Sequence, residues 1–184
     1  MTNLSVNVNK IALIRNSRKG NTPCIENFSR ICLAGGAKGI TVHPRPDLRH
    51  IRPDDLEILS NLAKEKSVEF NIEGNPYEVR KGDYPGFMSL IEDFKPTQCT
   101  LVPDSSYQLT SDHGWNILSE ISRLEPIINQ LKDWNIRVSL FLDHDIAQIE
   151  AAKNLNIDRV EIYTGAYAEA VKNNDLQTID NYEQ

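Results

Sequence analysis

The chain has 184 residues, of which 40% are hydrophobic and 25% are charged, and it contains nine glycines and nine prolines. This composition excludes collagen-like, fibrous and low-complexity proteins, and the length suffices for one sizeable core, so we expect a single domain over residues 1–184. The net charge of −6 argues against a broad nucleic-acid surface. The net charge does not exclude a pocket that binds a small anion, because binding there depends on the local charge around the pocket.

The sequence also bears on where the protein works. No apolar run approaches the ~20 residues that a membrane helix needs, and the N-terminal segment lacks the apolar stretch of a secretory signal. The three cysteines, Cys24, Cys32 and Cys99, have no metal-like spacing, so neither a disulfide framework nor a metal site is expected. We therefore predict a cytoplasmic protein that binds neither membrane nor nucleic acid.

Six short runs rich in β-branched residues predict strands. In chain order they are Ser5–Asn9, Gly39–His43, Glu69–Glu73, Gln98–Pro103, Arg137–Asp143 and Arg159–Gly165. Their starts fall roughly 22 to 39 residues apart, which is the rhythm of repeated βα units. Such repetition favours a parallel sheet with helices outside it.

Stretches with helical spacing separate most of these strands. Five apolar faces are predicted, around Phe28, Leu59, Leu90, Leu124 and Ile149. The first face includes Ile31, and the second begins near Pro53, where a proline costs little. Pro126 predicts a kink or a break in the fourth helix. The polar stretch Asn173–Gln184 falls where a sixth helix would finish.

Polar residues near the carboxyl ends of the strands decide between a barrel and an open sheet. By the two-residue period of a strand, the pairs that share a face are Asn7 with Asn9, Thr41 with His43, Asn71 with Glu73, and Glu161 with Tyr163. In a (β/α)₈ barrel, several strands typically place such residues at the same end of the barrel. The sequence has no GxGxxG motif, which would indicate a dinucleotide-binding sheet. We therefore predict an α/β fold, an incomplete TIM (β/α)₈ barrel with about six of the eight βα units. A smaller open sheet is the alternative.

The densest group of chemically active residues is ITVHPRPDLRHI, residues 40–51. It places His43, Arg45, Arg49 and His50 at or just after a strand end. Arginines there can hold phosphate or carboxylate, and a neutral histidine can move protons near pH 7. A solvated basic loop is the alternative interpretation.

A second anion site is predicted in RNSRKGNT, residues 15–22, preceded by Lys10. An ordinary exposed turn explains this segment equally well. Cations concentrate in the first third of the chain, which fits a phosphorylated substrate; they are Lys10, Arg15, Arg18, Arg45, Arg49 and Arg52.

Two acids lie among apolar strand residues. Glu73 is in FNIEG and Glu161 is in VEIYTG. Carboxylates in apolar surroundings have raised pKa values and suit proton transfer, although each acid could instead pair with a cation on a neighbouring strand. Asp143 and His144 occupy a similar strand end, although Asp-His-Asp, residues 143–145, is explained equally well as the cap of the next helix.

Several motifs together resemble the pyridoxine 5′-phosphate synthase (PdxJ) family of vitamin B6 biosynthesis. They are VNVNKIALIRNSRKG, GITVHPRPDLRHI, FNIEG, TLVPD with LTSDHGW, VSLFLD and VEIYTGAYA, and they run from about Leu4 to Tyr167. The resemblance implies a transferase-type condensation of 1-deoxy-D-xylulose 5-phosphate with 3-amino-2-oxopropyl phosphate and closure of the pyridine ring. It implies no metal and no organic cofactor, small phosphorylated substrates, and a homo-oligomer, an octamer in the family.

The resemblance also implies roles for individual residues. His43 and Glu73 match the general acid/base residues, and Glu161 matches an acid that stabilises charged intermediates. Asn7 and Arg18 match contacts to the aminoketone phosphate. The family residues that contact the sugar phosphate are matched in this sequence by Arg45, His50 and Thr110. Asn9 and Lys10 stand where many members have Asp-His, and a lysine there can still hold a phosphate or hydroxyl.

The family's seventh and eighth strands end in Gly-His motifs that are absent from this sequence. We therefore expect the chain to hold the first six units of a C-terminally truncated synthase, with negligible turnover alone if the true stop follows Gln184. One alternative is an inactive barrel fragment that needs a complementing chain. Another is a different phosphate-binding barrel, an isomerase or an aldolase that forms a Schiff base on Lys10.

Overall fold

The computed structural model describes residues 2–105 and 107–183. Six parallel strands form one sheet in chain order: β1 (Ser5–Asn7), β2 (Gly39–Val42), β3 (Glu69–Gly74), β4 (Gln98–Leu101), β5 (Arg137–Leu142) and β6 (Arg159–Ile162). Because every neighbouring pair is parallel, all six carboxyl ends lie at the same edge of the sheet. The segments that follow them therefore gather at that edge.

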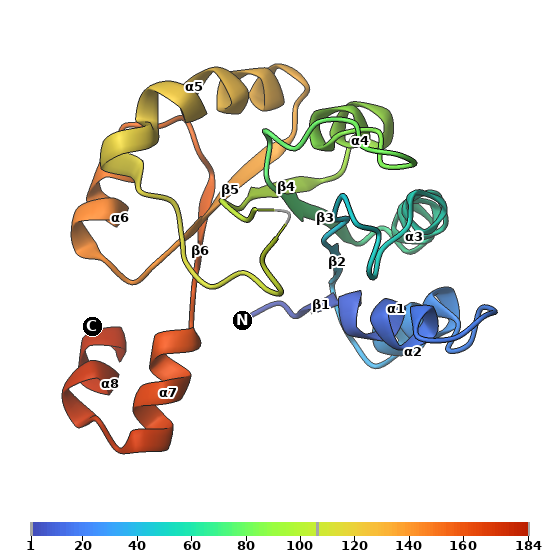
Figure 1. The fold of residues 1–184 in the computed structure, drawn as a ribbon, viewed down its shortest axis with the longest axis horizontal. Helices are drawn as coiled ribbons and strands as arrows, with labels where there is room; N and C mark the ends of the chain where they lie inside the picture. The colour runs from blue at the N-terminus through green and yellow to red at the C-terminus, as the bar shows by residue number, and fades with distance from the viewer. Residues whose placement is uncertain (1, 106, 184) are drawn as a thin grey trace.

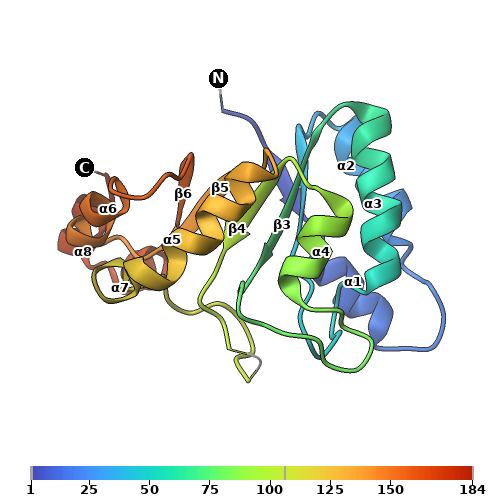
Figure 2. The same cartoon turned by 90° about the horizontal axis from the view of Figure 1, so that it is seen from above.

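Eight helices are described. They are α1 (Asn9–Asn16), α2 (Ile25–Ala34), α3 (Pro53–Lys66), α4 (Phe87–Phe94), α5 (Ile117–Asp133), α6 (Ile146–Ala152), α7 (Gly165–Asn173) and α8 (Leu176–Glu183). Figure 1 shows α1 to α6 in an arc around the strands, with α7 and α8 as a hairpin beyond β6. In the view turned by 90°, one side of the molecule holds α2, α3 and α4, and the other side holds α6, α7 and α8 (Figure 2).

The two faces of the sheet differ in chemistry. Alternate strand residues such as Ile40, Ile72 and Leu140 are buried in a hydrophobic core with residues of the helices. The opposite, inner face is polar. Its side chains line a cavity of about 400 Å³ and include Asn7, Thr41, Asn71, Glu73, Gln98, Ser139 and Glu161. The two-residue period of a strand explains this division.

This architecture confirms the predicted incomplete (β/α) barrel with six units. A curved parallel sheet with helices outside and polar residues inside positions side chains from successive strands around one mouth. None of the described helices is both long and apolar enough to cross a membrane.

The structure corrects the predicted ends of several strands. β1 ends at Asn7, and Asn9 is the first residue of α1, so these two residues do not share a strand face. The helix α1 was missed because its sequence, NKIALIRN, has little amphipathic pattern and directly follows the strand. Similarly, β2 ends one residue before His43 and β6 ends one residue before Tyr163.

Three helix predictions are also refined by the structure. Pro126 lies inside α5, which continues from Ile117 to Asp133 instead of breaking. Ile31 does not belong to the buried face of α2, since its side chain is 70% exposed. The polar C-terminal stretch forms α8 after a separate α7, rather than the end of a single helix.

Candidate active site

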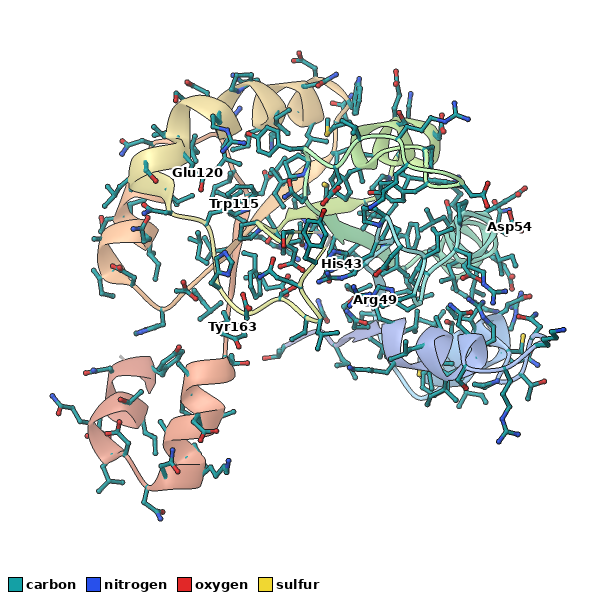
Figure 3. The ribbon with its side chains drawn as sticks, viewed as in Figure 1. His43, Arg49, Asp54, Trp115, Glu120 and Tyr163 are labelled. Atoms are coloured by element: carbon teal, nitrogen blue, oxygen red, sulfur yellow. The ribbon has the colours of Figure 1, made fainter. Side chains whose placement is uncertain are left out.

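A cavity of about 320 Å³ opens at the carboxyl edge of β1, β2 and β3. Eight of the ten residues that the sequence predicts for the site line it: Asn7, Asn9, Lys10, His43, Arg45, His50, Glu73 and Thr110. Figure 3 shows His43 and Arg49 near the centre of the molecule, whereas Asp54 lies on the outer side with α3. The topology thus brings together side chains that are up to 103 residues apart in sequence.

His43 directly follows β2 and is buried. Its backbone N–H donates to Oδ1 of Asn9 at 2.9 Å, and the backbone N–H of Asn9 donates to Oδ1 of Asn7 at the same distance. These bonds join the ends of β1 and β2. Burial, followed by the positive charge of Arg45, holds the pKa of His43 well below its ordinary value of 6.5. The imidazole is therefore neutral at pH 7 and able to accept a proton.

His50 lies across from His43, with their ring centroids 6.1 Å apart. Its Nδ1 accepts the backbone N–H of Ile51 at 3.0 Å, so the proton of the neutral ring is on Nε2. Burial, followed by the positive charge of Arg45, lowers the pKa of His50 from 6.5 to about 4. His50 is therefore a neutral hydrogen-bond donor, a role that suits contact with a phosphate oxygen.

Two arginines beside these histidines contact the loop between β4 and α5, residues 102–116. Arg45 is buried in an ion pair with Asp104 and also donates Nη1 to the carbonyl of Gln108 at 3.0 Å. Arg49 pairs with Asp47 and donates Nη1 to the carbonyl of Leu109 at 2.9 Å. These contacts hold the loop near the cavity that Thr110 also lines.

Glu73 is buried on the inner face of β3. Asn71 Nδ2 donates to its Oε1 at 3.3 Å, and Asn7 Nδ2 lies 3.5 Å from its Oε2. Burial raises the pKa of Glu73 well above its ordinary value of 4.5, and the charges of Glu161 and Asp104 raise it further. A carboxyl group in this setting is able to donate a proton near neutral pH.

Glu161 does not line the 320 Å³ cavity. It lines the polar interior of the sheet, on the other side of Glu73, which borders both spaces. Burial raises the pKa of Glu161, and a hydrogen bond with Thr100 lowers it. The charge of Glu161 therefore acts on Glu73, although only Glu73 lines the 320 Å³ cavity with the cations.

Two cations of the predicted anion sites lie elsewhere. Arg18 is exposed after the end of α1 and lines neither cavity. Arg15 is buried on α1 and makes two bonds to Asp55 of α3, at 2.5 and 2.8 Å. The inclusion of Arg15 among the substrate cations is therefore wrong, because its charge is used in a structural ion pair.

Sequence reasoning missed Asp104 and gave no role to Asn71. Asp104 follows Pro103 just after β4, so its place after a strand was a usable signal. Asn71 shares the inner face with Glu73, and its Oδ1 accepts a hydrogen bond from Thr100 Oγ1 at 3.1 Å. Across residues 2–105 and 107–183, no group of three or more His, Cys, Asp or Glu side chains is arranged to hold a metal ion.

Comparison with known proteins gives consistent results. Residues 4–184 match the family described as pyridoxal phosphate biosynthesis protein PdxJ. The chain is 53% identical over 169 residues to pyridoxine 5′-phosphate synthase of Xanthomonas axonopodis pv. citri, covering 92% of this chain and 66% of that protein. For the synthase of Xylella fastidiosa strain M12 the identity is 49% over 168 residues, covering 91% and 65% respectively. The chain thus spans slightly less than two thirds of these relatives.

Among solved structures, the fold is similar to deoxyribose phosphate aldolase from Aeropyrum pernix. The TM-score is 0.53, and the match covers 90% of this chain and 63% of the aldolase. Because the identity is only 14%, this likeness supports the barrel architecture alone.

Proposed function

We propose, from the premise that this chain belongs to the PdxJ family of pyridoxal phosphate biosynthesis proteins, that it supplies the sugar-phosphate-binding and acid–base part of a pyridoxine 5′-phosphate synthase site. The reaction would condense 1-deoxy-D-xylulose 5-phosphate with 3-amino-2-oxopropyl phosphate and release phosphate and water. The observation that carries this proposal is the meeting of His43 and Glu73 with a group of cations around one cavity.

His43 and Glu73 differ in protonation state, and this difference suits a reaction that needs both a proton acceptor and a proton donor. Burial favours a neutral imidazole at His43 and a protonated carboxyl group at Glu73. One group can therefore accept a proton and the other can donate one within the same cavity. Imine formation, loss of water and ring closure each need such transfers. Glu161, on the inner side of Glu73, is proposed to stabilise positive charge on an intermediate.

The cations around the cavity suit the phosphate of the sugar. Arg45 and Arg49 offer charged N–H donors, His50 offers a neutral one, and the cavity is also lined by Lys10 and Thr110. Asn7 is proposed to contact the aminoketone. The proposed contact of Arg18 with the aminoketone phosphate rests on the family resemblance, since Arg18 is outside the cavity.

The family also suggests how the protein is used in the cell. We propose that it works in the cytoplasm and assembles with further copies of itself. Small phosphorylated molecules are its proposed substrates, and no further cofactor is part of the proposal. Size-exclusion chromatography with light scattering would measure the assembly directly.

Two measurements on the purified protein test the proposed function. Calorimetry with 1-deoxy-D-xylulose 5-phosphate reports binding to the chain without requiring turnover. Product formation from both substrates is then followed by chromatography, for the chain alone and after co-purification with a polypeptide matching the remaining third of the Xanthomonas axonopodis relative. We expect binding in the first measurement and pyridoxine 5′-phosphate in the co-purified sample of the second.

The control for both measurements is Glu57→Gln, at an exposed position on the outer helix α3. It should bind the sugar phosphate and form product as the unaltered chain does. Absence of sugar-phosphate binding by the unaltered chain would contradict the proposed function. Binding without product in the co-purified sample would contradict only the acid–base part of the proposal.

A further inference from the structure

Asp104 is a buried carboxylate whose role the proposed reaction leaves open. It lies in the loop between β4 and α5, and its side chain is 3% exposed. Oδ2 forms an ion pair with Arg45 and accepts the hydroxyl proton of Ser111 at 2.6 Å. The backbone carbonyl of Asp104 accepts a hydrogen bond from Nδ2 of Asn75 at 2.8 Å. Asp104 therefore contacts the segments that follow β2 and β3 as well as its own loop.

The bond to Asp104 restrains the guanidinium of Arg45 but leaves some of its N–H donors free. An arginine has five N–H donors, and here one contacts Asp104 and another the Gln108 carbonyl. The remaining donors belong to a side chain that lines the 320 Å³ cavity with Lys10 and His50. A planar guanidinium fixed along one edge presents its free donors in a defined direction.

Asp104 also restrains the loop that carries Thr110. Ser111, its hydrogen-bond partner, directly follows Thr110, and both residues line the cavity. The same carboxylate oxygen thus holds the arginine and the loop together. Oδ1, by contrast, is buried without a hydrogen-bond partner among the described residues. Arg45 is accordingly the cation that balances the buried charge of Asp104 within the described part of the chain.

We propose that Asp104 is a positioning residue for the sugar phosphate, which orients Arg45 and Thr110 toward the same phosphate group. This inference rests on the proposed function, because it takes the 320 Å³ cavity as the sugar-phosphate site. Asp104 acts through Arg45 and the loop and has no direct contact with substrate. Its negative charge opposes anion binding, so the proposal requires that orientation outweighs this repulsion.

Calorimetry with 1-deoxy-D-xylulose 5-phosphate tests the proposal on the chain itself. Asp104→Asn keeps the shape of the side chain but removes the charge that holds Arg45. We expect the Kd to rise on the order of tenfold, the scale of one charge-assisted hydrogen bond. Asp104→Glu keeps the carboxylate and should restore binding to within about threefold of the unaltered chain. Inorganic phosphate, as a second probe, should lose affinity by a similar factor in Asp104→Asn.

Asp55→Asn is the matched control. It also breaks a buried arginine–carboxylate pair, with Arg15, but this pair lies outside the cavity. Both Asn variants should lower the melting temperature, whereas only Asp104→Asn should raise the Kd. Should Asp104→Asn fail to fold, Ser111→Ala provides a second test, because it removes only the hydroxyl bond to Asp104 and should weaken binding several-fold.

Each outcome separates this inference from the proposed function. If the unaltered chain does not bind the sugar phosphate, the proposed function fails and the inference fails with it. If the unaltered chain binds and Asp104→Asn binds equally well, only the inference is overturned. Tighter binding by Asp104→Asn also overturns it, because Asp104 would then act as a competing counter-charge.

Discussion

The strands β3 and β6 carry the same kind of signal in sequence but lie in different surroundings. Each has a glutamate on the inner face of the sheet, Glu73 and Glu161. β3 is paired on both sides, with β2 and β4, and Glu73 is buried. Among the described residues, β6 is paired only with β5; its first two residues are exposed, and Glu161 is half-buried.

This difference shows that an acid in an apolar strand acquires its properties from its neighbours in space. Burial raises the pKa of both glutamates, but only that of Glu73 lies well above the ordinary value. Asn7 of β1 and His43 after β2 line the 320 Å³ cavity with Glu73, and Asn71 of β3 itself donates to the Glu73 carboxylate. The region around β1 to β3 thus encloses the 320 Å³ cavity, whereas β6 begins with two exposed residues. The following predictions test this contrast.

The largest expected effect distinguishes two histidines that each follow a strand. His43→Ala should lower kcat by ~10²–10⁴-fold, the scale expected when an acid–base group is removed. His144 follows β5 but stacks on Tyr182, with ring centroids 4.3 Å apart, instead of lining the cavity. His144→Ala should therefore change kcat by less than about threefold.

Turnover of both variants is measured in the co-purified sample described above, with the unaltered chain as reference. Equal losses in the two variants would show that the β5–β6 end of the sheet is as much a part of the site as the β1–β3 end. A near-normal kcat in His43→Ala would remove His43 from its proposed role.

The second prediction compares packing at the two strands. Ile72 of β3 is fully buried, so Ile72→Ala should destabilise the protein by about 2–5 kcal/mol through lost burial and a cavity. Val160 of β6 is 41% exposed, and Val160→Ala should cost less than about 1 kcal/mol. Urea unfolding monitored by circular dichroism measures both. A cost for Val160→Ala that approaches that of Ile72→Ala would mean that β6 is covered in solution.

The same contrast explains what the sequence could predict. The six strands and the polar inner face follow from local alternation, which is why Asn71, Glu73 and Glu161 were placed on the correct face. The meeting of Lys10 and His43 follows from the shared carboxyl edge of parallel strands, whereas Thr110 was expected at the site from the family resemblance alone. Short-range patterns were therefore sufficient for most of the rim.

Partners distant in sequence could not be predicted. Arg15 and Arg45 look alike as cations in sequence, but Arg15 is paired with Asp55 on α3 and Arg45 with Asp104 in the loop after β4. Which of them lines the 320 Å³ cavity depends on contacts 40 and 59 residues away. α1 was missed for a related reason, since its weak amphipathic pattern gives no sign of the ion pair through which it contacts α3.

The third prediction concerns the pH dependence of stability near the cavity. The folded protein holds the pKa of His50 at about 4, below the ordinary 6.5, so between pH 6.5 and about 4 the unfolded chain binds a proton at this residue that the folded chain does not. Acidification through this window therefore destabilises the fold, by up to about 1.4 kcal/mol per pH unit for this residue. His43 acts in the same direction. The raised pKa of Glu73 acts in the opposite direction, because protonation there favours the folded state.

His50→Asn isolates the contribution of His50, since His43 and Glu73 remain in both proteins. The asparagine can still accept the Ile51 N–H, but it does not titrate. Urea midpoints measured from pH 7 to pH 4.5 should fall less steeply in His50→Asn than in the unaltered chain. Equal slopes in the unaltered chain and His50→Asn would mean that water reaches His50 freely, and the β1–β3 region would then be as open as the region around β6.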